Sequence, residues 1–294
     1  MEELVDSTHL AEDQNALQTT FARDGYLLIR SALDPDDLNA AVCAVRAALQ
    51  RGGWIDADGT MLPEGCSSDA RASHPAYRAA ADSVEFHRLP YLTPLRRLVA
   101  NLLGPNVYPL PSKVLRATPP AQYKTEPGRF AHQDFSYWGI NDMITTWVPL
   151  MDISEQLGGL ALLPGSHLEP QIELRVLSSH EPRWATTRYR IGDVVVFHCL
   201  TTHAALPNML NALRISGDFR WQLPEEPVSA ELIFGAKQRV HELFSQALKH
   251  EPWWTPVPSS VPIVEGRTYP LGRSRLFPVH PSWQEWSEPD GGLS

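Results

Sequence analysis

A histidine and an aspartate stand two residues apart in the stretch "FAHQDFSYWG", residues 130 to 139. On an extended chain, side chains two positions apart point to the same face, roughly 6.5 Å from each other. The imidazole of His132 and the carboxylate of Asp134 could then converge on one metal ion. Most such triplets are ordinary solvated loop residues, so the pair indicates a metal site only where the rest of the chain supplies further ligands.

A further ligand is offered by "GDVVVFHCLTTHAALPN", residues 192 to 208, which reads as a strand followed by a turn. His203 stands where the apolar run ends, and functional side chains tend to lie at strand ends and in adjoining loops. His198 directly follows the apolar run, so we expect it to be a packed or hydrogen-bonded histidine. Two histidines and one carboxylate with open positions suit non-haem Fe(II) and oxygen chemistry. A structural zinc site would need four ligands, usually including thiolates.

The stretch "ALRISGDFRWQL", residues 212 to 223, separates polar from apolar side chains with a period of two. We expect such a strand to pack its apolar face on outer helices and to turn its polar face into a barrel cavity. The polar face carries Ala212, Arg214, Ser216, Asp218, Arg220 and Gln222, and the apolar face carries Leu213, Ile215, Phe219, Trp221 and Leu223.

Two arginines on this polar face differ in their expected roles. Arg214 follows His203 by eleven residues. A tight turn would bring its guanidinium beside the metal, where it would clamp a carboxylate through two hydrogen bonds. Arg220 lies about 20 Å further along the strand. We therefore assign the clamp to Arg214 and expect Arg220 in a surface ion pair.

The elements that must position these residues change character along the chain. Two helices flank a short strand at residues 26–30, and a further helix is expected near 91–103. From about residue 107, short β-type runs alternate with Pro, Gly and Asn, which predicts a sandwich or barrel. A helix at 229–249 and a tail rich in Pro and Trp follow.

We expect one domain over residues 1–294. Its β core spans about 107–223, with N-terminal helices within 12–103 and the C-terminal helix and tail within 225–294. With 43% apolar residues, the chain can bury a large core.

Composition excludes some classes of partner. The net charge of −9 argues against general binding to nucleic acids or anionic membranes, which attract basic surfaces. The three cysteines follow no metal or disulfide spacing, and we find neither a signal-peptide pattern nor an apolar run of membrane-spanning length. We therefore expect a cytoplasmic protein with a small-molecule substrate, no nucleic-acid partner and no membrane.

The order of these motifs resembles a known family. "HQD", "TTWVPLMDISEQLGGLALLPGSH", "GDVVVFHCLTTHAALPN" and then Arg214 are similar to the phytanoyl-CoA dioxygenase family of Fe(II)- and 2-oxoglutarate-dependent oxygenases. The resemblance runs from about residue 15 to 223 and is strongest at 130–220. It implies a mainly β fold, a double-stranded β-helix (jelly roll, cupin-like) core with helices packed outside.

The same resemblance implies the ligand set and the cosubstrates. Iron would be held by His132, Asp134 and His203, and Arg214 would hold the distal carboxylate of 2-oxoglutarate, with O2 as the other cosubstrate. Related halogenases carry a small residue in place of the aspartate. The presence of Asp134 therefore favours hydroxylation or another oxidation.

Further pocket residues follow by position. Trp147 would lie on a strand that lines the cosubstrate pocket, where a core tryptophan is the alternative, and Ser112 and Val114 would face the pocket from the preceding strand. The candidates for contacting the substrate are Phe135, Tyr137, Trp138 and Arg116. His167 follows a Pro-Gly turn and is expected to be a hydrogen-bonded turn residue. Gly158 and Gly159 would supply positive φ angles in a hairpin.

The substrate itself is not encoded in any motif. A small natural-product intermediate is our first expectation, and an acyl-CoA thioester or an amino acid is the alternative within the family. Three other classes remain open. A cupin-like enzyme without 2-oxoglutarate would tolerate loss of Arg214, a catalytically inactive binding protein would form no succinate, and a zinc hydrolase would work without oxygen.

Overall fold

The computed structural model describes residues 1–62, 74–123, 130–140, 142–169, 175–176, 183–230, 248–255, 257–264 and 274–278. Two of the expected helices begin with acidic caps. The Asp13 side chain accepts from the Ala16 backbone N–H at the start of α1, Gln14–Asp24, and Asp34 accepts from Asp36 at the start of α2, Pro35–Arg51. Such caps satisfy backbone donors that the first helical turn leaves unpaired.

Three further helices complete the N-terminal part. These are α3, Pro75–Ala81, α4, Val84–Arg88, and α5, Thr93–Leu103, the last confirming the helix expected near 91–103. None of the helices in the described ranges is both long and apolar enough to span a bilayer. Most of the C-terminal helix expected at 229–249 falls on residues 231–247, which are outside the described residues.

A six-stranded sheet forms one half of the β core. Its order is β2-β10-β6-β12, and β3 and β4 both pair with the long strand β12. The strands are β2, Tyr26–Ile29, β3, Tyr108–Pro109, β4, Val114–Thr118, β6, Ile144–Pro149, β10, Val194–His198, and β12, Arg214–Gln222. All of these pairings are antiparallel.

A four-stranded sheet of order β1-β9-β7-β11 forms the other half. It contains β1, Glu2–Glu3, β7, Leu160–Leu162, β9, Ala185–Thr186, and β11, His203–Ala205. Two further two-stranded sheets are formed by β5, Phe130–Ala131, with β8, Arg175–Val176, and by β13, Val228–Ser229, with β14, Ile263–Val264. β1 is a strand of the smaller sheet and β2 is a strand of the larger one. Strands of the β core therefore also lie before residue 107, outside the expected range of 107–223.

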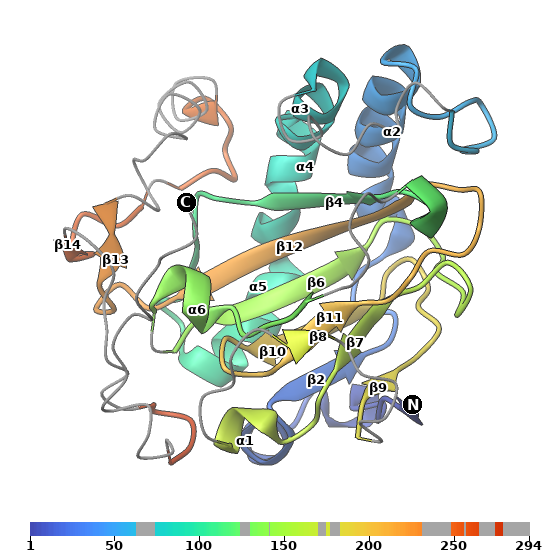
Figure 1. Ribbon diagram of the computed structural model, residues 1–294. Helices are drawn as coiled ribbons and strands as arrows, with labels where there is room; N and C mark the ends of the chain where they lie inside the picture. The colour runs from blue at the N-terminus through green and yellow to red at the C-terminus, as the bar shows by residue number, and fades with distance from the viewer. Residues whose placement is uncertain are drawn as a thin grey trace.

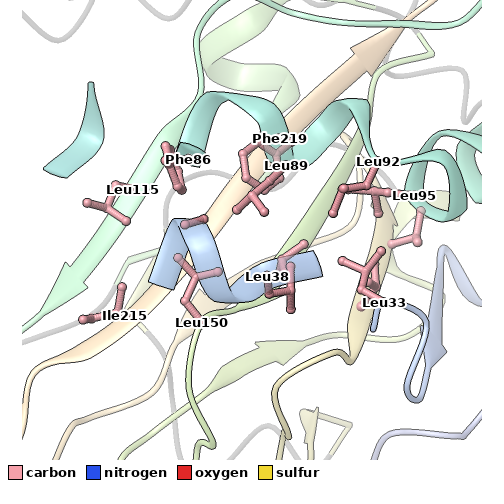
Figure 2. Packing of buried hydrophobic residues seen from close by; sticks show 14 of the residues in the cluster. Leu33, Leu38, Phe86, Leu89, Leu92, Leu95, Leu115, Leu150, Ile215 and Phe219 are labelled. Carbon is pink, nitrogen blue, oxygen red and sulfur yellow. The ribbon is translucent and has the colours of Figure 1, made fainter. Parts of the chain in front are cut away.

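The helices cover the outer face of the larger sheet, as the alternation in β12 predicts. In Figure 1, α4 and α5 lie behind the larger sheet, with α5 behind β12 and β6. Figure 2 shows Phe86 and Leu89 packed beside Phe219, and Leu115 and Ile215 nearby. The rings of Phe86 and Phe219 lie 5.4 Å apart between centroids. This apolar layer fixes β12 from outside and leaves its other face for polar groups.

The inner face of the larger sheet packs on the smaller one. Leu28, Trp147, Val195 and Phe197 from β2, β6 and β10 share one buried cluster with Leu160, Leu162, Ala185 and Tyr189. Apolar side chains therefore close the interior near β2 and β10. The polar side chains of β12 line the interior on the other side of β6 in the same sheet.

The packing of β12 on the helices predicts a large stability cost for Phe219→Ala. Phe219 is fully buried, so truncation should lower the free energy of unfolding by about 3–5 kcal/mol, as for other buried phenylalanines. Met209→Ala removes a side chain that is 69% exposed and should change stability by less than about 0.5 kcal/mol. Urea unfolding of both variants tests this, and similar losses in the two would contradict the assigned packing.

Candidate metal and cosubstrate site

Backbone pairing brings two histidines side by side. The N–H of His132 donates to the carbonyl of His203 at 3.0 Å, and the N–H of His203 donates back to the carbonyl of His132 at 2.9 Å. Reciprocal bonding of this kind places two side chains on the same face of an antiparallel pair. The centroids of the two imidazole rings are consequently 4.2 Å apart.

Asp134 lies beside the two histidines, but its backbone conformation differs from the extended one that was expected. Its φ and ψ of −57° and −28° are helical, and it directly precedes the short helix α6, Phe135–Trp138. The expectation of an extended His132–Asp134 pair on one strand is therefore wrong, because the chain turns after the His132 bridge. Contacts with the turn after β10 fix this conformation, since Gln133 donates to the carbonyl of Leu200 and the Phe135 N–H donates to that of Cys199.

The three ligand atoms surround a common space. The Nε2 atoms of His132 and His203 each lie 3.7 Å from Oδ1 of Asp134, and one ligand atom of each residue lies within 4.8 Å of the others. A separation of 3.7 Å is longer than a normal hydrogen bond, so the three atoms face one another across a space that an ion could fill. Two imidazoles and one carboxylate fit a divalent transition metal with further positions open.

His203 is set in the tautomer that a metal requires. Its Nδ1–H donates to the carbonyl of Thr201 at 3.0 Å, which leaves the lone pair of Nε2 directed at Asp134. Burial, together with the neighbouring His132, lowers the pKa of His203 to about 4. The imidazole is therefore neutral at physiological pH and able to coordinate a metal.

Arg220 lies beside Asp134, which corrects the expected surface ion pair. The guanidinium is 3% exposed, and its Nε and Nη2 donate to Oδ2 and Oδ1 of Asp134 at 3.2 and 3.4 Å. The Thr145 hydroxyl also donates to Oδ2, at 2.7 Å. Burial alone would raise the pKa of Asp134, but Arg220 and the two imidazoles hold it well below its usual value. The carboxylate is therefore ionised.

Arg214 is buried at the other end of β12. Its Nη1 donates to the carbonyls of Gly158 and Gly159 at 2.5 and 3.2 Å, and its Nη2 donates to the Thr118 hydroxyl at 2.8 Å. Burial, with a smaller contribution from Arg116, lowers its pKa to about 10, so it stays charged at neutral pH. Its Nε–H is buried without an acceptor in the described structure. Nε and Nη2 together form the edge that a carboxylate engages through two bonds.

The inner face of β12 carries several such unpartnered atoms. Ser216 Oγ, Asp218 Oδ1 and Arg220 Nη1 are, like Arg214 Nε, buried without a hydrogen-bond partner among the described residues. The four residues alternate along one strand, so the atoms follow one another along the interior. Buried polar atoms normally find partners, and such a row indicates bound ligands or water. The alternation in the sequence already placed Ser216, Asp218 and Arg220 on this face, but it gave Ser216 and Asp218 no role and Arg220 only a surface ion pair.

Arg116 lies on β4 in the same region. It pairs in register with Ser216, and its Nε donates to Asp218 Oδ2 at 2.7 Å. Its side chain is 43% exposed, and it interacts electrostatically with Asp134 and Arg214. Arg116 therefore joins the metal end of the interior to the Arg214 end. Lys124 and Arg129, two further basic residues of this stretch, are outside the described residues.

The other expected pocket residues have different positions. Trp147 is buried on β6, pairs in register with Asp218, and packs edge-on against Tyr189 with 4.6 Å between ring centroids. Val114 begins β4 and also pairs with Asp218, so it belongs to the inner face. Ser112 precedes the strand, which corrects its expected place on it.

The aromatic residues after Asp134 divide into two groups. Phe135 is fully buried in an apolar cluster with Tyr108 and Leu110, so its burial assigns it to the core. Tyr137 is 37% exposed, and its ring meets that of His132 edge-on at 5.3 Å. The Trp138 ring lies under the guanidinium of Arg220 at 4.9 Å. Tyr137 therefore borders a metal ligand and Trp138 borders the arginine that contacts Asp134, whereas Phe135 packs in the apolar cluster.

Two histidines are structural, as expected. His198 is fully buried and accepts from the Leu200 N–H, with its Nε2 at 3.6 Å from Asp142. His167 is also fully buried, and its Nε2–H donates to the carbonyl of Ala22 at 3.0 Å. The nearby glycine turn is only half as predicted, because Gly158 has a φ of 71° whereas Gly159 has no positive φ.

Comparison with known proteins finds one matching family model and several similar proteins. The family model of phytanoyl-CoA dioxygenase matches residues 21–216, about two thirds of the chain. Among individual proteins, 1-deoxypentalenic acid 11-beta-hydroxylase of Streptomyces exfoliatus is 28% identical over 80% of this chain and 89% of its own length. The enzyme of the same description from Streptomyces arenae is also 28% identical, over 79% of this chain and 87% of its own length.

Solved structures agree on the fold. The alpha-ketoglutarate-dependent epimerase SnoN from nogalamycin biosynthesis aligns with a TM-score of 0.54 at 19% identity, over 74% of this chain and 85% of its own. EctD from S. alaskensis aligns with a TM-score of 0.53 at 19% identity, over 91% of this chain and 92% of its own. These likenesses confirm the double-stranded β-helix with helices outside it.

The buried His167 predicts a pH-dependent stability. Burial lowers its pKa from 6.5 to about 4, so the unfolded chain binds the proton more readily than the folded protein. The free energy of unfolding that depends on a neutral His167 is fully present above pH 6.5. It is lost as the pH falls toward 4, and the total loss is about 3 kcal/mol. In His167→Gln, the amide can still donate to the Ala22 carbonyl but does not titrate. Urea unfolding at pH 7 and 4.5 should show a smaller loss for the variant, and equal losses would contradict the assignment.

Proposed function

The chain belongs to the phytanoyl-CoA dioxygenase family, and we propose that it uses Fe(II), 2-oxoglutarate and O2 to oxidise an unactivated C–H bond of a small carboxylic acid. The substrate class is an intermediate of natural-product biosynthesis, and hydroxylation is the expected outcome. The individual roles of the site residues are part of the proposal.

One observation carries the proposal. A His–Asp–His triad and a buried arginine whose Nε–H has no acceptor among the described residues belong to the same interior. Gly159, which accepts from Arg214, lies three residues before Leu162, the strand partner of His203. By strand rise this places the two ends of the site about 10 Å apart. A five-carbon dicarboxylate that binds metal at one end and Arg214 at the other suits this arrangement.

Each part of the site then has a chemical task. His132, Asp134 and His203 hold the metal, and the Nε and Nη2 hydrogens of Arg214 receive the distal carboxylate. When bound, iron and 2-oxoglutarate supply the oxidant that removes a hydrogen atom from the substrate. The ring of Phe197, 4.6 Å from that of His203, covers one side of the triad with apolar surface and keeps water away.

The charge of the interior supports an acidic substrate. The charged groups that face one another in the described part are Arg116, Arg214, Arg220, Asp134 and Asp218. Three cations and two anions leave one positive charge. The charges of a divalent metal ion and a dianionic cosubstrate cancel each other. The one surplus positive charge of the protein is therefore available to a monoanionic substrate. Arg116 is the most exposed of the three cations and is therefore our choice to meet it.

The names of the relatives agree with this substrate class. The two hydroxylases that resemble the chain over most of its length act on 1-deoxypentalenic acid, a carboxylic acid. The assignment of a natural-product acid to this chain rests on that similarity and on the surplus positive charge beside Arg116.

Formation of the iron chelate tests the reaction class. Apo-protein mixed anaerobically with Fe(II) and 2-oxoglutarate should develop the weak visible charge-transfer band of an iron–oxoacid chelate. His132→Ala and Asp134→Ala should abolish the band because each loses a ligand. Arg214→Lys should keep it but require at least tenfold more 2-oxoglutarate, because Lys lacks the planar fork. A band that survives loss of His132 or Asp134 would contradict the ligand set.

Discrimination between an acid and its ester tests the substrate class. We expect 1-deoxypentalenic acid to stimulate succinate formation more than its methyl ester or phytanoyl-CoA. Arg116→Gln should raise the KM for the acid about tenfold, because one charge-assisted hydrogen bond of about 1.5 kcal/mol is lost. The KM for the methyl ester should not change. Arg188→Gln alters an arginine that is 76% exposed and paired with Glu155, and it serves as the control. Faster turnover of the thioester than of the acid would contradict the proposal.

A further inference from the structure

The two oxygens of Asp134 have unequal surroundings. Oδ2 accepts from the Thr145 hydroxyl at 2.7 Å and from Arg220 Nε at 3.2 Å. Oδ1 has the longer contact of 3.4 Å with Arg220 Nη2, and it is the oxygen that faces both imidazoles at 3.7 Å. Oδ2 is thus occupied by hydrogen bonds, whereas Oδ1 is directed at the space between the histidines.

Arg220 is itself held in place from several sides. It is 3% exposed, its guanidinium stacks over the Trp138 ring, and its Nη2 lies 3.5 Å from Oδ2 of Asp218. Asp218 in turn binds Arg116. The register of the central sheet pairs Arg220 with Thr145, so the two donors to Asp134 come from directly opposed positions on β12 and β6. The sheet itself therefore sets the orientation of the carboxylate.

We propose that Arg220 is a positioning residue which, together with Thr145, makes Asp134 a ligand through Oδ1 alone. A carboxylate that is free to rotate can bind a metal through both oxygens and occupy an additional coordination position. Engagement of Oδ2 by two donors prevents this and preserves the open positions that the cosubstrates need. The inference rests on the proposed metal site and adds to it a residue that the resemblance did not assign.

A fixed charge alone would not give this result. Lysine retains the positive charge of Arg220, but its ammonium group cannot address both oxygens of one carboxylate in the plane of the group. Arg220→Lys therefore separates the geometry of the fork from its charge. Thr145→Val similarly removes the hydroxyl donor while nearly preserving the shape of the side chain.

The test measures metal binding to the apo-protein without cosubstrate or turnover. Co(II) is titrated into wild type, Arg220→Lys and Thr145→Val, with isothermal calorimetry for affinity and visible absorption for coordination number. Partners of metal ligands typically contribute 10–100-fold to affinity. We expect both variants to bind Co(II) at least tenfold more weakly, with a changed d–d spectrum and a circular dichroism spectrum like that of wild type.

Two matched variants provide controls. Arg214→Lys makes the same replacement six residues away on the same face of β12, where the guanidinium contacts no metal ligand. Thr146→Val makes the same replacement next to Thr145, but the Thr146 hydroxyl bonds to Phe219 and Trp221 on the outer face. Both should bind Co(II) as wild type does, even where stability falls.

The outcomes are distinguishable. Unchanged Co(II) affinity and spectrum in Arg220→Lys and Thr145→Val would overturn the positioning role and leave the metal site standing. Failure of wild type itself to bind Co(II) would overturn the metal site, and the positioning role with it. Where Arg220→Lys does not fold, Thr145→Val decides, because a role for the sheet in orienting Asp134 requires its affinity to fall.

Discussion

The ionised carboxylate of Asp134 is only 1% exposed, and the neighbouring charged groups are arranged around it. An isolated buried charge is costly, and it persists only where opposite charges and hydrogen bonds compensate for it. Arg220 supplies the charge and Thr145 a hydrogen bond. Arg220 is buried as well and needs a further opposite charge, which Asp218 supplies. Asp218 in turn forms an ion pair with Arg116. The resulting series alternates in sign from the metal ligands toward the more exposed part of the interior.

The fold supports this series by dividing the two faces of one strand. Outward residues of β12 such as Phe219 pack on helices, and that apolar layer provides the stability that a polar interior cannot provide. Inward residues are left with donors and acceptors that the protein does not satisfy by itself. The reciprocal backbone bonds between His132 and His203 then place the imidazoles opposite the strand's last arginine. The apolar residues that stabilise the fold and the polar residues of the site thus lie on opposite faces of the same sheet.

The amino-acid sequence predicts the parts of the site that depend on local pattern. Alternation in β12 placed Arg214 on the inner face, and the order of motifs identified the family. The contact between Arg220 and Asp134 was missed, because it depends on the register of β12 against β6 and on the turn at Asp134, neither of which local spacing reveals. The distance between Arg214 and Arg220 along β12 suggested that Arg220 is far from the metal. The carboxylate of Asp134, however, lies at the Arg220 end of β12. Phe135 was likewise assigned to the substrate, because sequence does not tell a core aromatic from a pocket wall.

The coordination of Asp134 can be seen in a crystal structure of the protein grown anaerobically with Fe(II) and 2-oxoglutarate. We expect one iron bound by Nε2 of His132, Oδ1 of Asp134 and Nε2 of His203, with Oδ2 of Asp134 still hydrogen-bonded to Thr145. We also expect the distal carboxylate on Nε and Nη2 of Arg214. Iron bound elsewhere, Asp134 chelating through both oxygens, or the distal carboxylate on Arg220 would contradict the proposed site.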